Sequence, residues 1–294
     1  MKFLSGIVLL FLFPVLSYGQ CPVINAAMIN GCAIAPSTSE GINEFVHFST
    51  TASATAGSYT LSYGVNNPPA TGMPVNILAG SNASTQNGTG TLTSTNGCII
   101  NQVTSSATVI PANSNVIFIP SNFDNNYDLS GLCTTGTLYV VFINITAAPS
   151  NSWNAGGTFA NSSGASPRYL QITNNANNCT SGIVTYSGNG WPANTDGNSV
   201  WWNGSSTSYQ NNGCNTILPP KPTITPSAIA AVCEHTTSTT MAFTVTGNPD
   251  KYSIDWDNVA NAAGFTDIVG ADYLFLLLHL RFLQMHLRQH IPAV

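Results

Sequence analysis

Short runs of alternating apolar and polar residues recur along most of this chain, and they limit its fold more than any other feature. Each run spans about 4–8 residues and reads as a half-buried β-strand, because successive side chains of a strand point to opposite faces. No amphipathic helical stretch precedes residue 271. The runs are "CPVINAAMIN", "NEFVHFST", "SYTLSYG", "GTLTST", "NVIFIP", "LYVVFINIT", "RYLQITN", "GIVTYSG" and "SVWWNG".

Six Asn-Gly steps separate these runs. Asn-Gly tolerates positive φ and is favoured in the tight turns of β-hairpins. Many short strands with frequent turn signals predict an all-β sandwich. The steps are Asn30-Gly31, Asn87-Gly88, Asn96-Gly97, Asn189-Gly190, Asn203-Gly204 and Asn212-Gly213.

Seven cysteines indicate an oxidising compartment. Six lie between Cys21 and Cys214, and we expect Cys233, beyond a proline-rich break, to be free. Six cysteines allow 15 pairings, and the sequence does not choose among them. A zinc site would need closely spaced cysteine pairs, which are lacking. We predict nearest-neighbour disulfides, Cys21–Cys32, Cys98–Cys133 and Cys179–Cys214.

The N-terminus has the pattern of a signal peptide. A lysine is followed by an apolar run that ends at Leu16, and Ser17 and Gly19 fit the small positions before a cleavage site. The apolar run is shorter than the roughly 20 residues of a membrane-spanning helix. Residues 1–19 are therefore predicted to be removed from a secreted or cell-surface protein.

Charged residues make up only 6% of the chain, and the formal net charge is −5. A nucleic-acid-binding protein needs a cluster of Lys and Arg to displace counterions from phosphates. Lys221 and Arg168 stand almost alone in the mature chain, so binding to nucleic acid is not expected.

A proline-rich linker, "ILPPKPTITP" at 217–226, separates a first domain at 20–216 from a second β-unit at 227–270. Two strands are expected in the second unit, Met241–Thr246 and Tyr252–Asp257, on either side of the turn "GNPD". This unit has too few strands to close a sandwich by itself.

The tail at 271–294 lacks Gly, Ser, Thr and Asn, and His279 and Arg281 interrupt its apolar run. The run is too short to span a membrane. An amphipathic helix is one reading. We favour an out-of-frame translation, because codons shifted by one base are compatible with a continuation of the second β-unit that includes a Thr-Tyr-Thr-Gly strand. Met285-His286, for example, then encodes Ala.

Residues 21–216 resemble a lamin-tail-like, immunoglobulin-type sandwich domain of large secreted bacterial surface proteins. The pieces that carry the resemblance are "INEFVHFST", "VIPANSNVIFIP", "LYVVFINI", "SNSWNAGGTFANSSG", "RYLQI" and "TDGNSVWWNG". Residues 222–269 resemble the start of a PKD-like module through "GNPDKYSIDWDNVANAAGFTDI". The resemblance implies a disulfide-stapled immunoglobulin-like β-sandwich followed by an incomplete second sandwich, with no catalytic role.

Trp201 and Trp202 are adjacent on a predicted strand, so one ring should face the core and the other should face outward. With Trp191 and Tyr209 nearby in the sequence, an outward ring is a candidate for stacking on a sugar. The alternative is that both rings close the bottom of the sandwich.

Two acidic pairs are weak calcium candidates, Asp124 with Asp128 and Asp255 with Asp257. Calcium takes 6–8 oxygen ligands, several of them from carboxylates, and each pair supplies only two carboxylates. We therefore expect structural roles for these residues.

No catalytic residue is predicted. Glu44 and His47 lie three residues apart on an expected strand and should point to opposite faces, and no nucleophile on a strained turn accompanies them. No cofactor is expected. The sequence predicts a non-catalytic structural or adhesive module of a larger protein, with a surface glycan or another cell-surface protein as partner. A glycan-binding module that targets an enzyme is the main alternative, and a secreted hydrolase is the second.

Overall fold

The computed structural model divides the chain into two compact units. The first comprises Met1–Val200 and Asn211–Ile217, and the second comprises Trp201–Gln210 and Leu218–Val294. The residues that the structure describes are 21–34, 39–65, 75–77, 80–146, 153, 157–159, 167–186, 195–204, 206–220, 223–226, 243–246, 251–255, 257–262 and 266–272.

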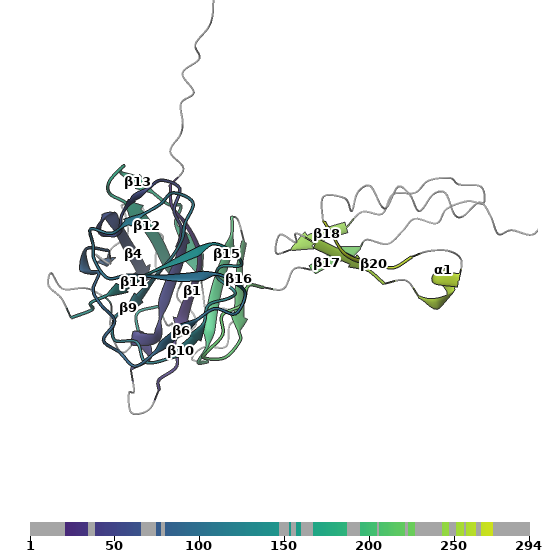
Figure 1. Cartoon of the computed structure of the whole chain (residues 1–294), viewed down its shortest axis with the longest axis horizontal. Helices are drawn as coiled ribbons and strands as arrows, with labels where there is room; N and C mark the ends of the chain where they lie inside the picture. The colour runs from purple at the N-terminus through teal and green to yellow at the C-terminus, as the bar shows by residue number, and fades with distance from the viewer. Residues whose placement is uncertain are drawn as a thin grey trace, which may run out of the picture. The chain divides into compact units, whose positions relative to one another are not determined.

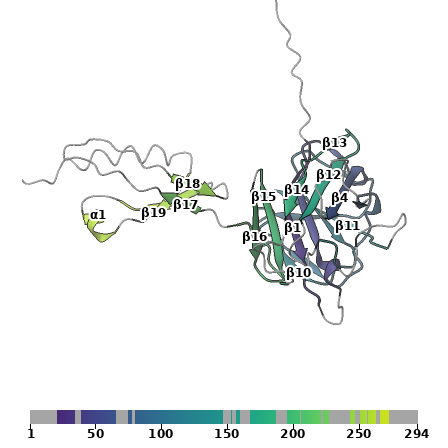
Figure 2. The same cartoon turned by 180° about the vertical axis from the view of Figure 1, so that it is seen from behind.

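The predicted disulfide-stapled all-β sandwich is confirmed. One sheet has seven strands in the order β16-β15-β1-β2-β9-β11-β7, and a second has the order β13-β12-β4-β5, with β14 also paired to β12. Figure 1 shows these strands from the purple β1 to the green β16, and Figure 2 shows β14 beside β12 from behind. The strands of the large sheet are β1 (Val23–Asn30), β2 (Phe45–Ser49), β7 (Ile99–Val103), β9 (Asn115–Pro120), β11 (Thr137–Ile143), β15 (Asn198–Asn203) and β16 (Ser206–Asn211). Those of the second sheet are β4 (Tyr59–Val65), β5 (Val75–Ile77), β12 (Arg168–Asn174), β13 (Cys179–Thr180) and β14 (Val184–Tyr186).

The core lies where the two sheets face each other. Phe48 of β2 is fully buried; its ring centroid lies 5.0 Å from that of Phe118 in β9 and 5.4 Å from that of Tyr59 in β4. Aromatic pairs at these separations contribute stability beyond their buried area. Each of the nine alternating runs contains a strand, so the period-two pattern predicted these elements correctly.

One end of the large sheet, formed by β9, β11 and β7, contains parallel strands. β11 runs parallel to both β9 and β7. Outside the sheet, β6 (Thr91–Thr93) runs parallel to β10 (Asn126–Asp128), whereas β3 (Ala54–Thr55) is antiparallel to β8 (Val109–Ile110). Parallel neighbours need crossover connections, and the chain makes them here through β8 and β10. The sheets of an immunoglobulin domain are antiparallel, so the strand directions in this sandwich differ from that pattern.

Most of the predicted Asn-Gly hairpins are not hairpins. Among the described residues, only Asn203-Gly204 lies in a short connection between two successive strands of one sheet, β15 and β16, and Gly204 has a φ of 69°. Asn30-Gly31 also lies between paired successive strands, β1 and β2, but it begins a long connection that contains a 3-10 helix. Asn96-Gly97, by contrast, connects β6 to β7, which belong to different sheets. Asn189-Gly190 lies outside the described residues. The Asn-Gly steps therefore predicted where the chain bends, but not which strands pair with each other.

Two of the three predicted disulfides were wrong. The structure pairs Cys21 with Cys179 and Cys32 with Cys214, whereas Cys98–Cys133 is as predicted. The cause is the place of β1, which lies between β2 and β15 in the large sheet. Its two ends are therefore close to late parts of the chain. Cys233 lies outside the described residues, so its predicted free state stays a prediction.

The two long-range disulfides close a small covalent ring. Each spans a long stretch of sequence, 158 residues for Cys21–Cys179 and 182 residues for Cys32–Cys214. Together they join the 11-residue step from Cys21 to Cys32 to the 35-residue step from Cys179 to Cys214. Three disulfides suit an extracellular, oxidising setting.

The second unit contains two two-stranded sheets. β17 (Thr223–Pro226) pairs with β18 (Phe243–Thr246), and β19 (Lys251–Ile254) pairs with β20 (Ile268–Asp272). The strands expected on either side of "GNPD" are thus present, but they belong to different sheets. A five-residue helix, α1 (Asn258–Ala262), precedes β20.

None of the helices in the described parts of the chain has the length and apolar character needed to cross a bilayer. The predicted signal peptide and residues 273–294 of the tail lie outside those parts.

Candidate functional site

The aromatic candidates lie where β15 leaves the core. Burial decreases along this strand, from buried Val200 through half-buried Trp201 and Trp202 to exposed Asn203. Because both residues are half-buried, their burial does not separate a core ring from an outward ring, and that assignment stays a prediction. Trp191 lies outside the described residues.

The hairpin register places two aromatic residues on one face. A two-residue connection between Asn203 and Ser206 sets Asn198 opposite Asn211, and the side chain of Asn211 donates a hydrogen bond to Asn198 Oδ1 at 2.8 Å. Trp202 and half-buried Tyr209 are then diagonal neighbours on the same face, within the reach of aromatic side chains. Trp201 belongs to the opposite face.

The calcium candidates of the first unit hold protein donors. Asp124 Oδ1 accepts a hydrogen bond from the Asn43 side chain at 2.6 Å. Asp128 Oδ1 accepts from the backbone N–H of Ser130 at 3.0 Å and from its hydroxyl at 2.5 Å. These bonds give both carboxylates a structural role.

In the second unit, Asp255 and Asp257 are exposed. No group of three or more His, Cys, Asp or Glu side chains that could hold a metal ion is found among the described residues. Calcium binding at either pair stays a prediction that nothing in this geometry favours.

His47 is buried in the large sheet. Its Nε2 lies 3.3 Å from Asn115 Oδ1, so Nε2 carries the proton and donates it, while buried Nδ1 has no hydrogen-bond partner. Burial lowers the pKa of His47 to about 4, and the bond to Asn115 raises it only in part. The ring is therefore neutral at pH 7. It belongs to a chain of hydrogen bonds that continues from Asn115 through the hydroxyl of Ser49 to Asn25.

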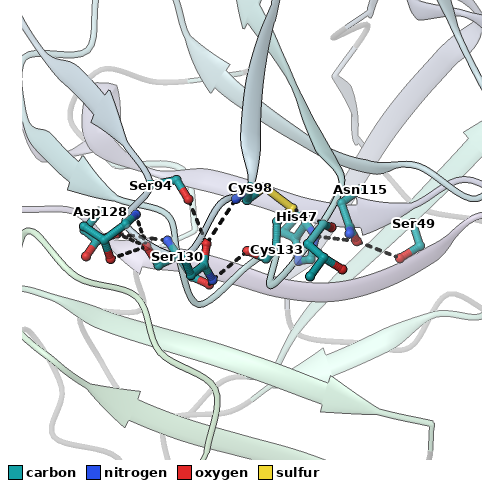
Figure 3. Close-up of a disulfide and its surroundings, with 11 residues drawn as sticks. His47, Ser49, Ser94, Cys98, Asn115, Asp128, Ser130 and Cys133 are labelled. Carbon is teal, nitrogen blue, oxygen red and sulfur yellow. Dashed lines mark hydrogen bonds between the residues drawn. A yellow bond between two sulfur atoms is a disulfide. The ribbon is translucent and has the colours of Figure 1, made fainter.

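Figure 3 shows this histidine among the surroundings of the Cys98–Cys133 disulfide, with Asn115 and Ser49 on one side of the bond and Ser94, Asp128 and Ser130 on the other. Asn96, next to the disulfide, donates to the backbone oxygens of Ser130 and Cys133 at 2.7 and 2.9 Å. The disulfide thus lies within a hydrogen-bonded scaffold that fixes the start of β7 beside the start of β11.

Glu44 anchors a distant segment of the chain. It follows a 3-10 helix at Glu40–Asn43, is fully buried, and accepts hydrogen bonds from the backbone N–H groups of Thr158, at 2.7 Å, and Phe159, at 3.1 Å. The Trp153 indole N–H donates to Gly41 O at 3.0 Å, which ties the same segment to that helix. These hydrogen bonds of Glu44 come from backbone groups, whereas His47 bonds to the side chain of Asn115.

Asn43 organises a second buried contact. Its side-chain nitrogen donates to Cys32 O at 2.7 Å, and its Oδ1 accepts from the backbone N–H groups of Asp124 and Asn125 at 3.0 and 3.1 Å. Asn125 in turn donates to Cys214 O. These amides surround the Cys32–Cys214 disulfide. Sequence reasoning missed Asn43 because its partners are backbone groups far away in the chain, which leave no local pattern.

Glu44→Gln is expected to lower the free energy of unfolding by about 1–2 kcal/mol, because a neutral amide accepts more weakly than a buried carboxylate from the two N–H groups. Urea unfolding at neutral pH measures this difference. Glu40→Gln, at a partly exposed carboxylate of the neighbouring helix, is the matched control and should change stability by less than about 0.5 kcal/mol. Equal effects of the two substitutions would contradict the anchoring role of Glu44.

Comparison of the chain with protein-family models finds no matching family, and comparisons with curated proteins and with solved structures find no significant match. The lamin-tail-like and PKD-like resemblances therefore stay predictions.

Proposed function

We propose that the chain is a non-catalytic structural or adhesive module of a secreted or cell-surface protein, as its resemblance to bacterial surface domains implies. The observation that carries this proposal is the covalent path through the first unit. Cys32–Cys214 connects the end of β1 to a point three residues before Ile217, where the unit ends. Tension that enters from the following chain thus reaches β1 almost directly.

β1 is well suited to hold such tension. It lies between two neighbours in the large sheet, and its last five residues are buried. A strand already rises about 3.3 Å per residue, close to the limit of an extended chain. Pulling on its ends therefore releases little additional length, and the chain between Cys32 and Cys214 is bypassed by the disulfide.

The described contacts of Glu44 and His47 are structural, which further supports a non-catalytic role. Glu44 accepts backbone hydrogen bonds, and His47 is neutral and buried. We propose no reaction for either residue.

Single-molecule stretching between handles placed before Cys21 and after Ile217 tests the mechanical proposal. The intact unit should release at most about 14 residues, or roughly 50 Å, because the path runs through 11 residues of the β1 segment and 3 beyond Cys214. Cys32→Ser with Cys214→Ser should release roughly 130 Å through the remaining Cys21–Cys179 bridge.

Full reduction is the control and should release roughly 700 Å, the length of the whole unit. An intact unit that extends as far as the reduced one would show that the bridges do not carry the tension, and would overturn the proposal.

A second candidate function is glycan binding, and the shared face of Trp202 and Tyr209 favours it. Aromatic rings provide flat apolar area with a polar edge, which suits the face of a sugar ring. The hairpin presents this pair at a place where burial is incomplete.

A glycan array probed with the full chain tests this candidate. If a glycan binds, Trp202→Ala should weaken binding by about tenfold or more, since it removes one stacking partner. Trp201→Ala, on the opposite face of the same strand, is the matched control and should bind nearly as well as the native chain. Equal loss in both variants, or no binding at all, would reject the candidate.

A further inference from the structure

The strand β7 (Ile99–Val103) is the last strand at one end of the large sheet. Among the described strands it pairs only with β11, to which it runs parallel. Ile99 is 65% exposed, and Asn101 and Gln102 are exposed as well. A strand in this position offers unpaired backbone N–H and C=O groups to a further strand.

The ladder between β7 and β11 shows which backbone groups point outward. Ile99 N–H donates to Gly136 O at 2.8 Å, so Ile99 and every second residue after it direct their backbone groups toward β11. The N–H and C=O groups of Ile100 and Gln102 therefore point away from the sheet. Within the described part of the chain, neither residue has a backbone hydrogen bond on that side.

The features that usually keep such an edge from pairing are missing. Edge strands are commonly blocked by a charged side chain, a proline or a bulge. Residues 89–110 contain no charged residue and no proline, and the register with β11 is regular over all five residues. The Cys98–Cys133 disulfide and the side chain of Asn96 hold the start of β7 beside β11. The edge is thus already ordered and loses little freedom when it pairs.

The five residues of β7 are self-complementary in an antiparallel register. When Asn101 lies opposite Asn101 of a second copy, Ile100 of each copy lies opposite Gln102 of the other. These are the two residues with outward backbone groups, so the two strands can exchange four hydrogen bonds. Ile99 then lies opposite Val103 of the second copy, and no two charges are brought together.

We propose that two copies of this chain pair through β7, antiparallel and about a two-fold axis at Asn101. Each copy occupies the open edge of the other, so the assembly closes at two copies and does not grow into a filament. An interface of two five-residue strands is expected to bury less than the roughly 1,200 Å² of a stable complex, so the dimer is weak and transient. This pairing rests on the edge of the sheet alone and does not depend on the proposed function.

Sedimentation equilibrium of the full chain measures the dimer. The mean mass should rise from that of the monomer toward twice that value between about 10 µM and about 1 mM. Gln102→Pro removes one outward N–H, and proline is tolerated in an edge strand where this group faces away from the ladder. The variant should therefore stay folded and remain monomeric up to about 1 mM. Gln102→Thr keeps the N–H, is the matched control, and should dimerise as the native chain does.

A disulfide trap tests the register. The Cα atoms of a non-hydrogen-bonded antiparallel pair lie about 4.5 Å apart, which a disulfide can span. Asn101→Cys should therefore form a covalent dimer on mild oxidation, linked between the two substituted positions. Gln102→Cys is the matched control, because its two Cα atoms would lie about 8 Å apart, beyond the reach of a disulfide. The native chain serves as the blank for any cross-link through Cys233.

Loss of dimerisation in Gln102→Pro, together with a covalent dimer in Asn101→Cys alone, would support the pairing through β7. A native chain that stays monomeric would overturn it and would leave this edge to a strand of a different protein. Self-association that persists in a folded Gln102→Pro variant would overturn it as well, because another surface would then be responsible. If Gln102→Pro does not fold, the two cysteine variants decide, and equal cross-linking of both would contradict the proposal.

Discussion

Replacing Cys21, Cys32, Cys179 and Cys214 together with serine is expected to leave the first unit unfolded at room temperature. In the chain-entropy model, closing the 158-residue loop stabilises the fold by about 5 kcal/mol, and closing the 11-plus-35-residue ring adds about 4 kcal/mol. Their sum, about 9 kcal/mol, is comparable to the whole stability of a typical domain, about 5–15 kcal/mol. Circular dichroism and urea unfolding measure the outcome.

The control for this variant is Cys98→Ser with Cys133→Ser, which opens a single loop of 35 residues. It should lose about 4 kcal/mol and still unfold cooperatively. If the fourfold variant instead unfolds cooperatively at the same urea concentration as the native chain, the long-range bridges contribute nothing to stability.

The free energy of unfolding should also fall by about 3 kcal/mol when the pH is lowered from about 6.5 to about 4, because of His47. In the folded state burial holds the pKa of His47 at about 4, below its ordinary value of 6.5. Between these two values the unfolded chain binds a proton that the folded chain does not. The stabilisation is therefore complete above pH 6.5 and is lost as the pH falls through 4.

Urea unfolding across this pH range, with His47→Gln as the comparison, isolates the effect. Glutamine stays neutral throughout and retains a donor for Asn115, whereas every carboxylate still titrates in both proteins. The difference between the two pH profiles is the contribution of His47. Profiles that run parallel would show that the imidazole does not control stability in this range.

The strands were predictable because their signal is local. Alternation in "EFVHFST" or "NVIFIP" reflects the two faces of one strand. As expected, the first run forms β2 and the second forms β9. Strand partners were not predictable, because they depend on where the rest of the chain lies. Nothing in "TLYVVFI" indicates that β11 runs parallel to both of its neighbours.

The candidate site shows the same limit. The run that contains the adjacent tryptophans predicted the strand β15. The incomplete burial of Trp201 and Trp202 was not predictable, because it depends on where the strand leaves the core. The sequence pattern around Glu44 did not predict a catalytic role. Its role as an acceptor for Thr158 and Phe159 could not be predicted, because a backbone N–H group belongs to almost every residue and so leaves no sequence signature.

The position of β1 also determines when this protein can fold. β1 begins at residue 23, and β15, one of its two neighbours, begins at residue 198. At a synthesis rate of about 5–20 residues per second, roughly 9–35 seconds separate the appearance of the two strands. During that interval the apolar β1 segment has an unpaired edge. Cys21 and Cys32 can then react with incorrect partners such as Cys98, which is synthesised before Cys179 and Cys214. A ribosome pause between residues 133 and 179 would therefore favour mispaired disulfides, while a chain completed quickly would leave less time for mispairing.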